Sequence, residues 1–253
     1  MCSFRDQETL DTMLRLIVIG LLFTICFGFK QGRIVDGNPT EITEHPYQVS
    51  LESEGYHFCG GSIISPDWVV TAAHCVTEGH SISVVDPSTL QVRAGSSYSG
   101  EGGSVHQVSK IIVHPEYAVS NDIAVLKVSP PFVFNDTVKP IPMATVSPSG
   151  GATAVVTGWG NGQYQLQELD VGIIDKRICN MQLFFINNSM LCAKALRLFK
   201  GPCSGDSGGP LVSNGKLVGV ASFVIGSCAA GFPDVYADVA YLRNWVESVT
   251  GVA

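Results

Sequence analysis

The stretch Gly205-Asp206-Ser207-Gly208-Gly209-Pro210 places one serine among three glycines. Glycine adopts backbone conformations that other side chains exclude, so this string predicts a tight turn that exposes the serine hydroxyl. In such a turn the backbone N–H groups of Gly205 and Ser207 can converge on a negatively charged oxygen. The string therefore predicts a nucleophile, Ser207, beside an oxyanion hole formed by Gly205 and Ser207.

Two upstream motifs supply the other groups that a nucleophilic serine needs. His74 stands in Thr71-Ala72-Ala73-His74-Cys75, and Asp122 stands in Asn121-Asp122-Ile123-Ala124. A serine hydroxyl is a poor nucleophile at neutral pH, so it needs an imidazole to accept its proton and a carboxylate to hold the imidazole tautomer. We therefore predict a catalytic triad of His74, Asp122 and Ser207.

The order of the triad along the chain is His, Asp, Ser, which differs from the order in subtilisin-like chains and in α/β-hydrolases. With their motifs, these residues resemble the chymotrypsin/trypsin family from about Ile34 to the C-terminus. The resemblance implies an all-β, trypsin-like fold of two packed six-stranded antiparallel β-barrels with a C-terminal helix. Barrel one would span about residues 34–140 and barrel two about 141–253. The implied activity is that of a serine endopeptidase acting through an acyl-enzyme.

Short apolar and alternating runs agree with an all-β fold. Asn214-Gly215, between two apolar runs, is a strong signal for a type I′ hairpin. Strands are expected at 47–51, 123–128, 154–157, 211–213 and 217–220. Helical periodicity is convincing only near the C-terminus, after a possible cap at Asp238. The residues expected on its apolar face are Tyr241, Leu242, Trp245, Val246 and Val249.

The N-terminal segment has the pattern of a secretory leader. Arg15 precedes an almost unbroken apolar run over residues 16–29, which is short for a membrane span. We predict a signal peptide over residues 1–28, with Met13 as an alternative start, and a secreted, extracellular protein. An uncleaved leader that tethers the protease to a membrane stays open as an alternative.

Arg33-Ile34-Val35-Asp36-Gly37 matches the activation junction of the family that the chain resembles. Residues 29–33 would then be a short propeptide, removed by an activating protease that cuts after Arg33. The resemblance implies that the new Ile34 ammonium pairs with Asp206 and orders the Gly205 backbone. His57 resembles a histidine that holds the equivalent of Asp206 in the zymogens of some relatives, with a purely structural role as the alternative.

Export into an oxidising compartment predicts that the cysteines outside the leader form disulfides. Six such cysteines allow fifteen connectivities, so spacing alone leaves the pairing open. The family resemblance implies three bridges, which are Cys59–Cys75, Cys179–Cys192 and Cys203–Cys228.

The resemblance also locates a specificity pocket, in which this chain departs from trypsins. Gly201 occupies the pocket base, where trypsins carry an aspartate, while Asp234 returns a carboxylate to the opposite wall. Ser222-Phe223-Val224 would line the substrate, and Val224 would reduce the pocket depth. These features are closest to invertebrate chymotrypsin-like enzymes and predict a hydrophobic P1 residue. Two alternatives stay open: cleavage after Lys or Arg with the help of Asp234, and a non-catalytic homologue acting as a binding module.

The charge balance bears on partners. Residues 34–253 contain 11 Lys and Arg and 19 Asp and Glu, a net charge of −8, with no basic cluster. This argues against binding to nucleic acid. Expected partners are protein or peptide substrates, the activating protease and protein protease inhibitors, with the enzyme as a monomer. No cofactor, no metal and, around residues 94–105, no calcium site is expected. Asn135-Asp136-Thr137 and Asn187-Asn188-Ser189 are potential N-glycosylation sites.

Overall fold

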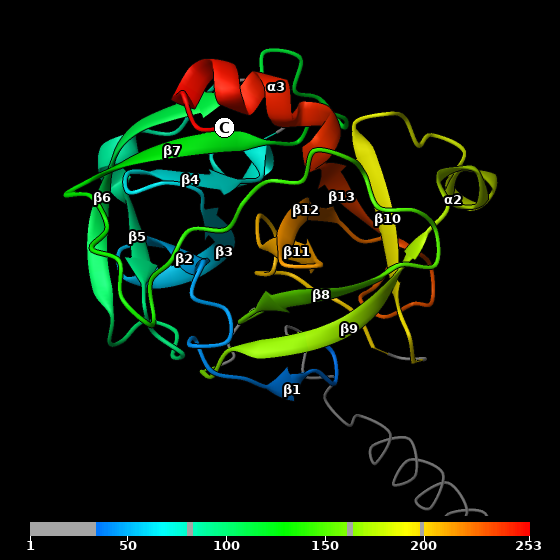
Figure 1. The fold of residues 1–253 in the computed structure, drawn as a ribbon, viewed down its shortest axis with the longest axis horizontal. Coiled ribbons are helices and arrows are strands. Elements are labelled where there is room, and N and C mark those ends of the chain that lie inside the picture. The colour runs from blue at the N-terminus through cyan, green and yellow to red at the C-terminus, as the bar shows by residue number, and fades with distance from the viewer. Residues whose placement is uncertain (1–33, 80–82, 161–163, 198–199) are drawn as a thin grey trace, which may run out of the picture. The chain divides into compact units, whose positions relative to one another are not determined.

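Two closed antiparallel β-barrels form the body of the protein (Figure 1). The computed structural model describes residues 34–79, 83–160, 164–197 and 200–253. The predicted signal peptide, the propeptide and Arg33 lie outside the described residues. The described part therefore confirms the expected fold class, which is two six-stranded barrels with a C-terminal helix.

The first barrel closes in the order β2-β3-β4-β7-β6-β5. Its strands are β2 (Gln48–Ser53), β3 (Tyr56–Ile63), β4 (Trp68–Thr71), β5 (Leu90–Ala94), β6 (Ser104–Val113) and β7 (Ala124–Ser129). Inward-facing Val, Leu and Ile side chains such as Val49, Leu51 and Leu126 are fully buried and form its core. The strands expected around 47–51 and 123–128 are confirmed as β2 and β7.

The second barrel is built from β8 (Thr153–Gly158), β9 (Gln167–Ile174), β10 (Met190–Ala195), β11 (Pro210–Ser213), β12 (Lys216–Phe223) and β13 (Asp234–Asp238). It closes through the additional pairing of β8 with β9. The short strand β1 (Asn38–Pro39) pairs with the start of β9. The described chain therefore starts on the second barrel before it builds the first.

The β11–β12 hairpin confirms the turn expected at Asn214-Gly215. Asn214 has φ 50° and Gly215 has φ 69°, the two positive angles that a type I′ turn requires. Because β11 begins at Pro210, the turn around Ser207 leads directly into this hairpin. The rigid hairpin thus fixes one end of the serine loop.

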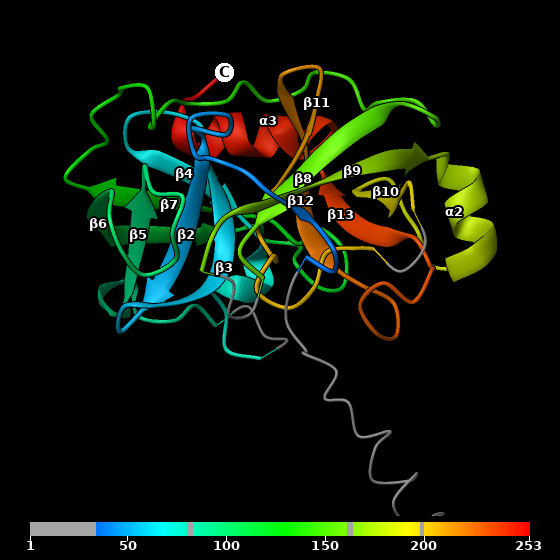
Figure 2. The same cartoon turned by 90° about the horizontal axis from the view of Figure 1, so that it is seen from below.

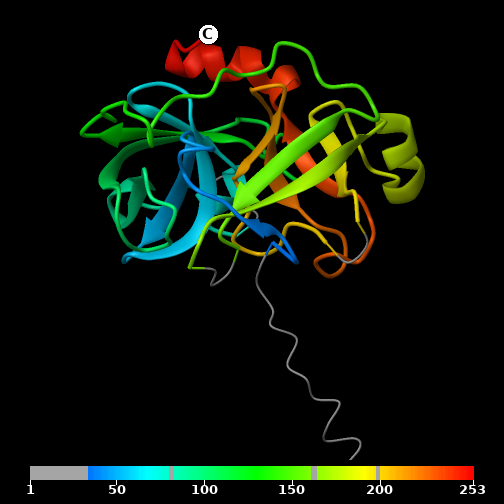
Figure 3. The same ribbon diagram turned by 60° about the horizontal axis from the view of Figure 1, so that its bottom comes forward.

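The C-terminal helix α3 (Val239–Thr250) begins at Asp238, whose carboxylate accepts a hydrogen bond from the Tyr241 N–H. Leu242 and Val246 are buried in a core shared with the first barrel, and Figures 1 and 3 show the helix (red) above strands of that barrel. Tyr241 is 56% exposed, so its expected place on the buried face is wrong. It lies one position from Leu242, at the edge of a narrow apolar face.

The shorter helix α2 (Lys176–Leu183) lies at the edge of the second barrel, on the side away from β6 (Figures 1 and 2). Two 3-10 turns, η1 (Ala73–Cys75) and η2 (Pro87–Thr89), belong to the first half of the chain. None of the helices in the described ranges is long and apolar enough to cross a membrane.

Close backbone packing brings the serine loop against the first barrel. A Cβ on Gly60 would lie 2.8 Å from the Gly209 Cα, so Gly60 must be glycine for the two segments to approach, and a Cβ on Gly209 would lie 2.8 Å from the Asp206 carbonyl oxygen. The Gly60 N–H then donates a 2.7 Å hydrogen bond to the Ser207 carbonyl. Nearby, the buried Thr157 hydroxyl donates to the Gln48 side chain and ties β8 to β2. Ser207 is therefore positioned by both barrels.

Three disulfides join Cys59 to Cys75, Cys179 to Cys192 and Cys203 to Cys228. They are the pairings that the family resemblance implies. Each closes a loop of 13 to 25 residues and, in the chain-entropy model, stabilises the fold by about 3 kcal/mol. The first bridge anchors the turn that carries His74, and the third closes a loop around the serine segment.

Candidate active site

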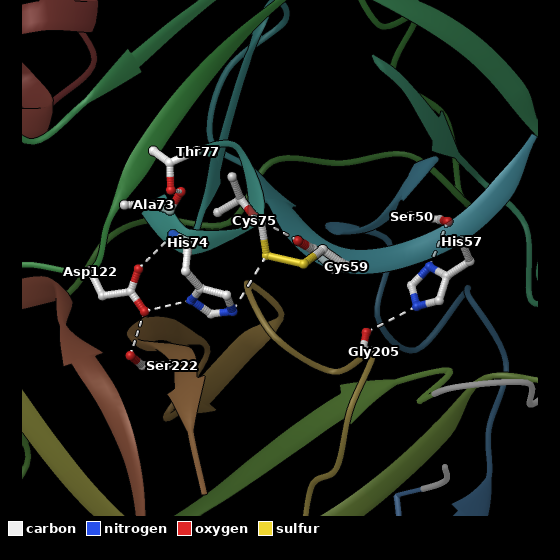
Figure 4. The surroundings of a disulfide bond; sticks show 12 residues. Ser50, His57, Cys59, Ala73, His74, Cys75, Thr77, Asp122, Gly205 and Ser222 are labelled. Atoms are coloured by element: carbon white, nitrogen blue, oxygen red, sulfur yellow. Dashed lines mark hydrogen bonds and ion pairs between the residues drawn. A yellow bond between two sulfur atoms is a disulfide. The ribbon is translucent and has the colours of Figure 1, made fainter. Parts of the chain in front are cut away.

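His74 and Asp122 meet at the mouth of the first barrel. His74 lies in η1, and Asp122 lies two residues before β7. The Asp122 carboxylate is 2.7 Å from the His74 Nδ1, and it also accepts a 2.9 Å hydrogen bond from the His74 backbone N–H (Figure 4). These two contacts fix both the position and the tautomer of the imidazole, because Nδ1 must carry the proton that the carboxylate accepts.

A third contact to Asp122 comes from the second barrel, where the Ser222 hydroxyl donates to the same carboxylate oxygen (Figure 4). Asp122 is 6% exposed. Burial opposes its ionisation, but the hydrogen bonds from His74 and Ser222 and the imidazole charge outweigh it and lower the pKa of Asp122. The carboxylate is thus held ionised behind His74.

Ser207 faces the same cleft as His74 and Asp122, and the cleft has a volume of about 460 Å³. Within the described ranges the Ser207 hydroxyl makes no hydrogen bond, and the His74 Nε2 has its one polar contact with the Cys75 sulfur at 3.9 Å. The expected contact between Ser207 and His74 is therefore open in this structure. Catalytic hydrogen bonds are often long without substrate and tighten only in its complex.

The backbone around Ser207 leaves two N–H groups without an acceptor. Among the residues that the structure describes, neither the Gly205 N–H nor the Ser207 N–H donates a hydrogen bond, while the neighbouring Asp206 N–H bonds to the Cys203 carbonyl. Gly205 has φ 91°, a conformation open to glycine. The two free donors are those expected to form the oxyanion hole.

His57 holds the outer side of this loop. Its Nε2–H donates to the Gly205 carbonyl over 3.0 Å, and its Nδ1 pairs with the Ser50 hydroxyl at 2.8 Å (Figure 4). Burial lowers the pKa of His57, although the Gly205 contact and the charge of Glu52 oppose the shift. His57 therefore contacts the carbonyl before Asp206, which differs from the contact with the Asp206 carboxylate that the resemblance implies for a zymogen.

Asp206 is a fully buried carboxyl group with hydrogen bonds but no counter-ion in the described structure. Its two oxygens accept from the Gly160 N–H at 2.8 Å and the Cys203 N–H at 2.9 Å. A Cβ on Gly158 would lie 2.2 Å from the carboxylate, so glycine is needed there. Burial raises the pKa of Asp206 to about 7, against the two backbone hydrogen bonds. The site favours either a proton or a cation.

The segment after the predicted cleavage site is bound to the pocket base. Ile34 is 1% exposed, and the Val35 N–H donates a 2.8 Å hydrogen bond to the Gly201 carbonyl. The Lys200 ammonium lies 2.9 Å from the Asp36 carboxylate. Lys200 was not expected in this role, because it is far from Asp36 in sequence and no motif marks it.

Gly201 and Asp234 face one another across the predicted specificity pocket. A Cβ on Gly201 would lie 3.7 Å from an Asp234 carboxylate oxygen, and Asp234 lines the cleft. Asp234 is 7% exposed, and burial raises its pKa to about 7, while the charge of Lys194 opposes the shift. Tyr236 also lines the cleft, and its buried hydroxyl has no hydrogen-bond partner among the described residues.

Ser222, Phe223 and Val224 line the cleft beside the pocket, as expected. Ser222 and Phe223 end β12, and Phe223 pairs with Val235 of β13. The contact of Ser222 with Asp122 was missed from the sequence, where the two are separated by 100 residues. Only folding brings the end of β12 beside Asp122, which lies just before β7 of the first barrel.

Cys59, His74 and Cys75 are close enough to resemble a metal-ligand set. The two cysteine sulfurs, however, are joined in a disulfide and offer no thiolate. The disulfide therefore accounts for this cluster, because it anchors the turn that carries His74.

A two-barrel fold with this cleft is typical of serine endopeptidases. The family described as trypsin matches residues 34–246. Trypsin alpha of Drosophila melanogaster is 45% identical over 231 residues, covering 86% of this chain and 87% of that protein. Hypodermin-B of Hypoderma lineatum is 43% identical over 229 residues, covering 85% and 86%. The chain belongs to the trypsin family, and it is a hydrolase that cleaves peptide bonds.

Proposed function

We propose that Ser207, His74 and Asp122 carry out peptide hydrolysis. The Ser207 oxygen attacks the substrate carbonyl carbon while the His74 Nε2 accepts the hydroxyl proton. Asp122 holds the Nδ1–H of His74 and stabilises the imidazolium that forms. The negative charge on the carbonyl oxygen is bound by the N–H groups of Gly205 and Ser207.

The second half of the reaction reverses these roles. The imidazolium gives its proton to the leaving amine, and an acyl-enzyme remains on Ser207. A water molecule, deprotonated by His74, then attacks the ester and releases the acid. The observation that best supports this proposal is the pair of free N–H groups beside Ser207, in a cleft that also contains the fixed His74–Asp122 pair.

Labelling with a fluorophosphonate probe tests the proposal. The probe phosphonylates only a serine activated by a base, as the serine oxygen bonds to phosphorus and fluoride leaves, so the activated protein should be labelled and the Ser207→Ala variant should not be. A non-catalytic homologue, acting only as a binding module, would bind peptides without taking the label. Absence of labelling in a correctly processed and folded protein would favour that alternative.

We propose that the protein is made as a zymogen and activated by a protease that cuts after Arg33. A buried carboxyl group without a counter-ion is unfavourable, and Asp206 is such a group here. Cleavage would give Ile34, already buried, a new ammonium group that can pair with Asp206. That pair would stabilise the Gly205–Ser207 turn. An Arg33→Gln precursor should stay inactive when treated with trypsin-like activators.

We propose that, near or below neutral pH, the enzyme prefers substrates with a hydrophobic P1 residue. The base position, Gly201, has no charge, and Val224 lies at the cleft. Asp234 is protonated below its pKa of about 7 and then acts as a neutral polar wall. Medium or large apolar side chains fit such a site best.

Cleavage after Lys or Arg is the second candidate, because Asp234 lines the cleft and ionises above pH 7. A cationic P1 side chain beside the carboxylate would lower the raised pKa of Asp234 and gain a charge-assisted contact. The similarity to proteins named trypsins also favours this candidate. A P1 peptide library read at two pH values separates the two preferences, as set out below.

We further propose that the protein is secreted, acts outside the cell as a monomer and meets protein substrates and protein protease inhibitors there. The apolar segment over residues 16–29 supports entry into the secretory pathway. Three disulfides fit an oxidising compartment. N-terminal sequencing of protein from the culture medium tests the cleavage site, and retention of the leader on a membrane-bound product would favour the tethered alternative.

A further inference from the structure

Two exposed apolar patches lie directly before the two Asn-x-Ser/Thr sequences. The first patch is Val133 and Phe134, which are 80% and 42% exposed and precede Asn135. The second patch is Ile178, Met181, Phe184 and Phe185, of which Phe184 is 84% exposed, and it precedes Asn187. Neighbouring exposed apolar side chains offer a surface that another group can cover.

The two asparagines share one local geometry, although they lie on different parts of the fold. The Asn135 side-chain oxygen accepts hydrogen bonds from the Thr137 N–H at 2.8 Å and the Thr137 hydroxyl at 2.9 Å. The Asn187 side-chain oxygen accepts from the Ser189 N–H at 3.0 Å and the Ser189 hydroxyl at 2.9 Å. In both cases the hydroxyl of the sequence motif holds the amide oxygen.

This geometry leaves the amide nitrogen of each side chain available. Asn135 and Asn187 are exposed, and within the described part of the chain neither Nδ2 donates a hydrogen bond. A substituent on Nδ2 would keep the amide oxygen and both of its hydrogen bonds. The folded protein can therefore carry a group on either nitrogen without losing a contact.

We propose that Asn135 and Asn187 each carry an N-linked glycan, and that the first sugars cover the apolar side chains that precede each asparagine. This inference rests on the proposed secretion, since the glycan donor is met only in the secretory pathway. Sugar rings have C–H faces that pack against aromatic rings, and Phe134 and Phe184 present such rings to solvent. The glycans would make these surfaces polar and raise solubility.

The modification is a transfer from a lipid-linked oligosaccharide diphosphate. The asparagine Nδ2 attacks C1 of the first sugar, a C–N bond forms and the bond between C1 and the diphosphate oxygen breaks. The lipid diphosphate leaves with the bonding electron pair, and the amide nitrogen gives up one proton. No oxidant or reductant takes part.

The local chain offers matched controls. Asn188 is also exposed but is followed by Ser189-Met190, so it is outside the recognition pattern as an acceptor. Replacing Asn188 by Gln keeps the Asn187 motif, and replacing Thr137 by Ser keeps the Asn135 motif. Thr137→Val removes only the hydroxyl that the motif requires. Ser189 is left unchanged, because its hydroxyl also accepts the Asn121 N–H beside Asp122.

The full chain is expressed in cultured insect cells, recovered from the medium and analysed by peptide mass spectrometry before and after enzymatic glycan release in ¹⁸O water. We expect sugar on both asparagines, one site lost in Asn135→Gln, Asn187→Gln and Thr137→Val, and both kept in Asn188→Gln and Thr137→Ser. Unmodified Asn135 and Asn187 peptides from secreted protein would overturn the inference while leaving secretion intact.

If the full chain stays inside the cell, the proposed secretion is wrong but glycosylation is still testable. Residues 29–253 are then expressed behind a foreign signal sequence, and the two asparagines of the secreted product are analysed in the same way. Residues 29–253 include both complete barrels. The covering role is tested by binding of an apolar fluorescent dye. The Asn135→Gln, Asn187→Gln double variant should bind several-fold more dye than the glycoprotein, and adding Phe134→Ser and Phe184→Ser should reverse the gain. Equal dye binding by glycoprotein and double variant would show that the sugars do not cover the patches.

Discussion

The Lys200 ammonium contacts Asp36 twice, at 2.9 Å from its carboxylate and at 2.6 Å from its carbonyl oxygen. Asp36 has φ 56°, an unusual backbone angle for a residue other than glycine. Lys200 directly precedes Gly201, whose carbonyl accepts the Val35 N–H. The two residues therefore join the segment after the cleavage site to the base of the specificity pocket.

Loss of this link should reduce the fraction of active enzyme after cleavage. Asp36 is exposed, so the ion pair is worth at most about 1 kcal/mol. We expect Lys200→Ala to lower kcat/KM by roughly two- to fivefold, with Lys200→Arg close to wild type. Active-site titration measures the fraction of active enzyme, and peptide hydrolysis per total enzyme gives kcat/KM. The control is Lys110→Ala, which replaces a lysine on β6. Full activity of Lys200→Ala would show that the remaining contacts hold the segment alone.

Replacement of Ser207 by Ala should remove turnover without unfolding the protein. Ser207 is partly exposed in a glycine-rich turn, and its hydroxyl has no hydrogen bond to lose among the described residues. By comparison with measured triad deletions, the loss in kcat should be on the order of 10⁶. Peptide hydrolysis gives the activity, and thermal unfolding with disulfides intact gives the control. Near-normal hydrolysis would contradict the proposed mechanism.

The precursor should lose stability as the pH rises, because of Asp206. The folded-state pKa of Asp206 is about 7, well above the value of an unfolded aspartate, so the folded chain holds this proton more tightly. Between about pH 4 and pH 7 the unfolded state binds fewer protons, and stability falls as pH rises. The pKa of Asp234 is raised as well, so Asp234 also makes stability fall as the pH rises. The test must therefore compare two proteins that differ only at Asp206.

We expect Asp206→Asn to flatten this pH dependence in an Arg33→Gln, Ser207→Ala precursor. The Asn side chain has no charge to bury, so the variant should melt higher than its parent at about pH 8 and close to it at about pH 5. Thermal unfolding at the two pH values measures the difference. The same melting temperatures at both pH values for parent and variant would show that Asp206 already has a partner in the precursor.

Asp234 should make P1 selection depend on pH. Below about pH 7 its carboxyl group is protonated and apolar P1 residues should be preferred; above it, relative kcat/KM for Lys and Arg should rise as the group ionises. A P1 library at about pH 5.5 and pH 8.5 measures the ratio, and Asp234→Asn, of equal size, should abolish its change with pH. A strong preference for Lys or Arg at both pH values that disappears in Asp234→Asn would establish the trypsin-like alternative.

The two-barrel fold followed from the family resemblance, whereas the sequence by itself determined five of the strands, the C-terminal helix and the three residues proposed as the triad. These features depend on local patterns, such as the Asn214-Gly215 turn, the capped helix at Asp238 and the strings around His74, Asp122 and Ser207. Local patterns are readable because turn geometry and side-chain alternation act over a few residues. The disulfide pairing followed from the family resemblance and not from spacing.

Contacts between distant segments were decided by the tertiary structure alone. Ser222 reaches Asp122, and Lys200 reaches Asp36, only because β12 and the N-terminal segment are brought beside them. The pKa values of Asp206 and Asp234 are also set by the fold, since burial is the main cause of both shifts. Desolvation depends on every neighbour around a carboxyl group, and those neighbours come from several strands that no local pattern relates.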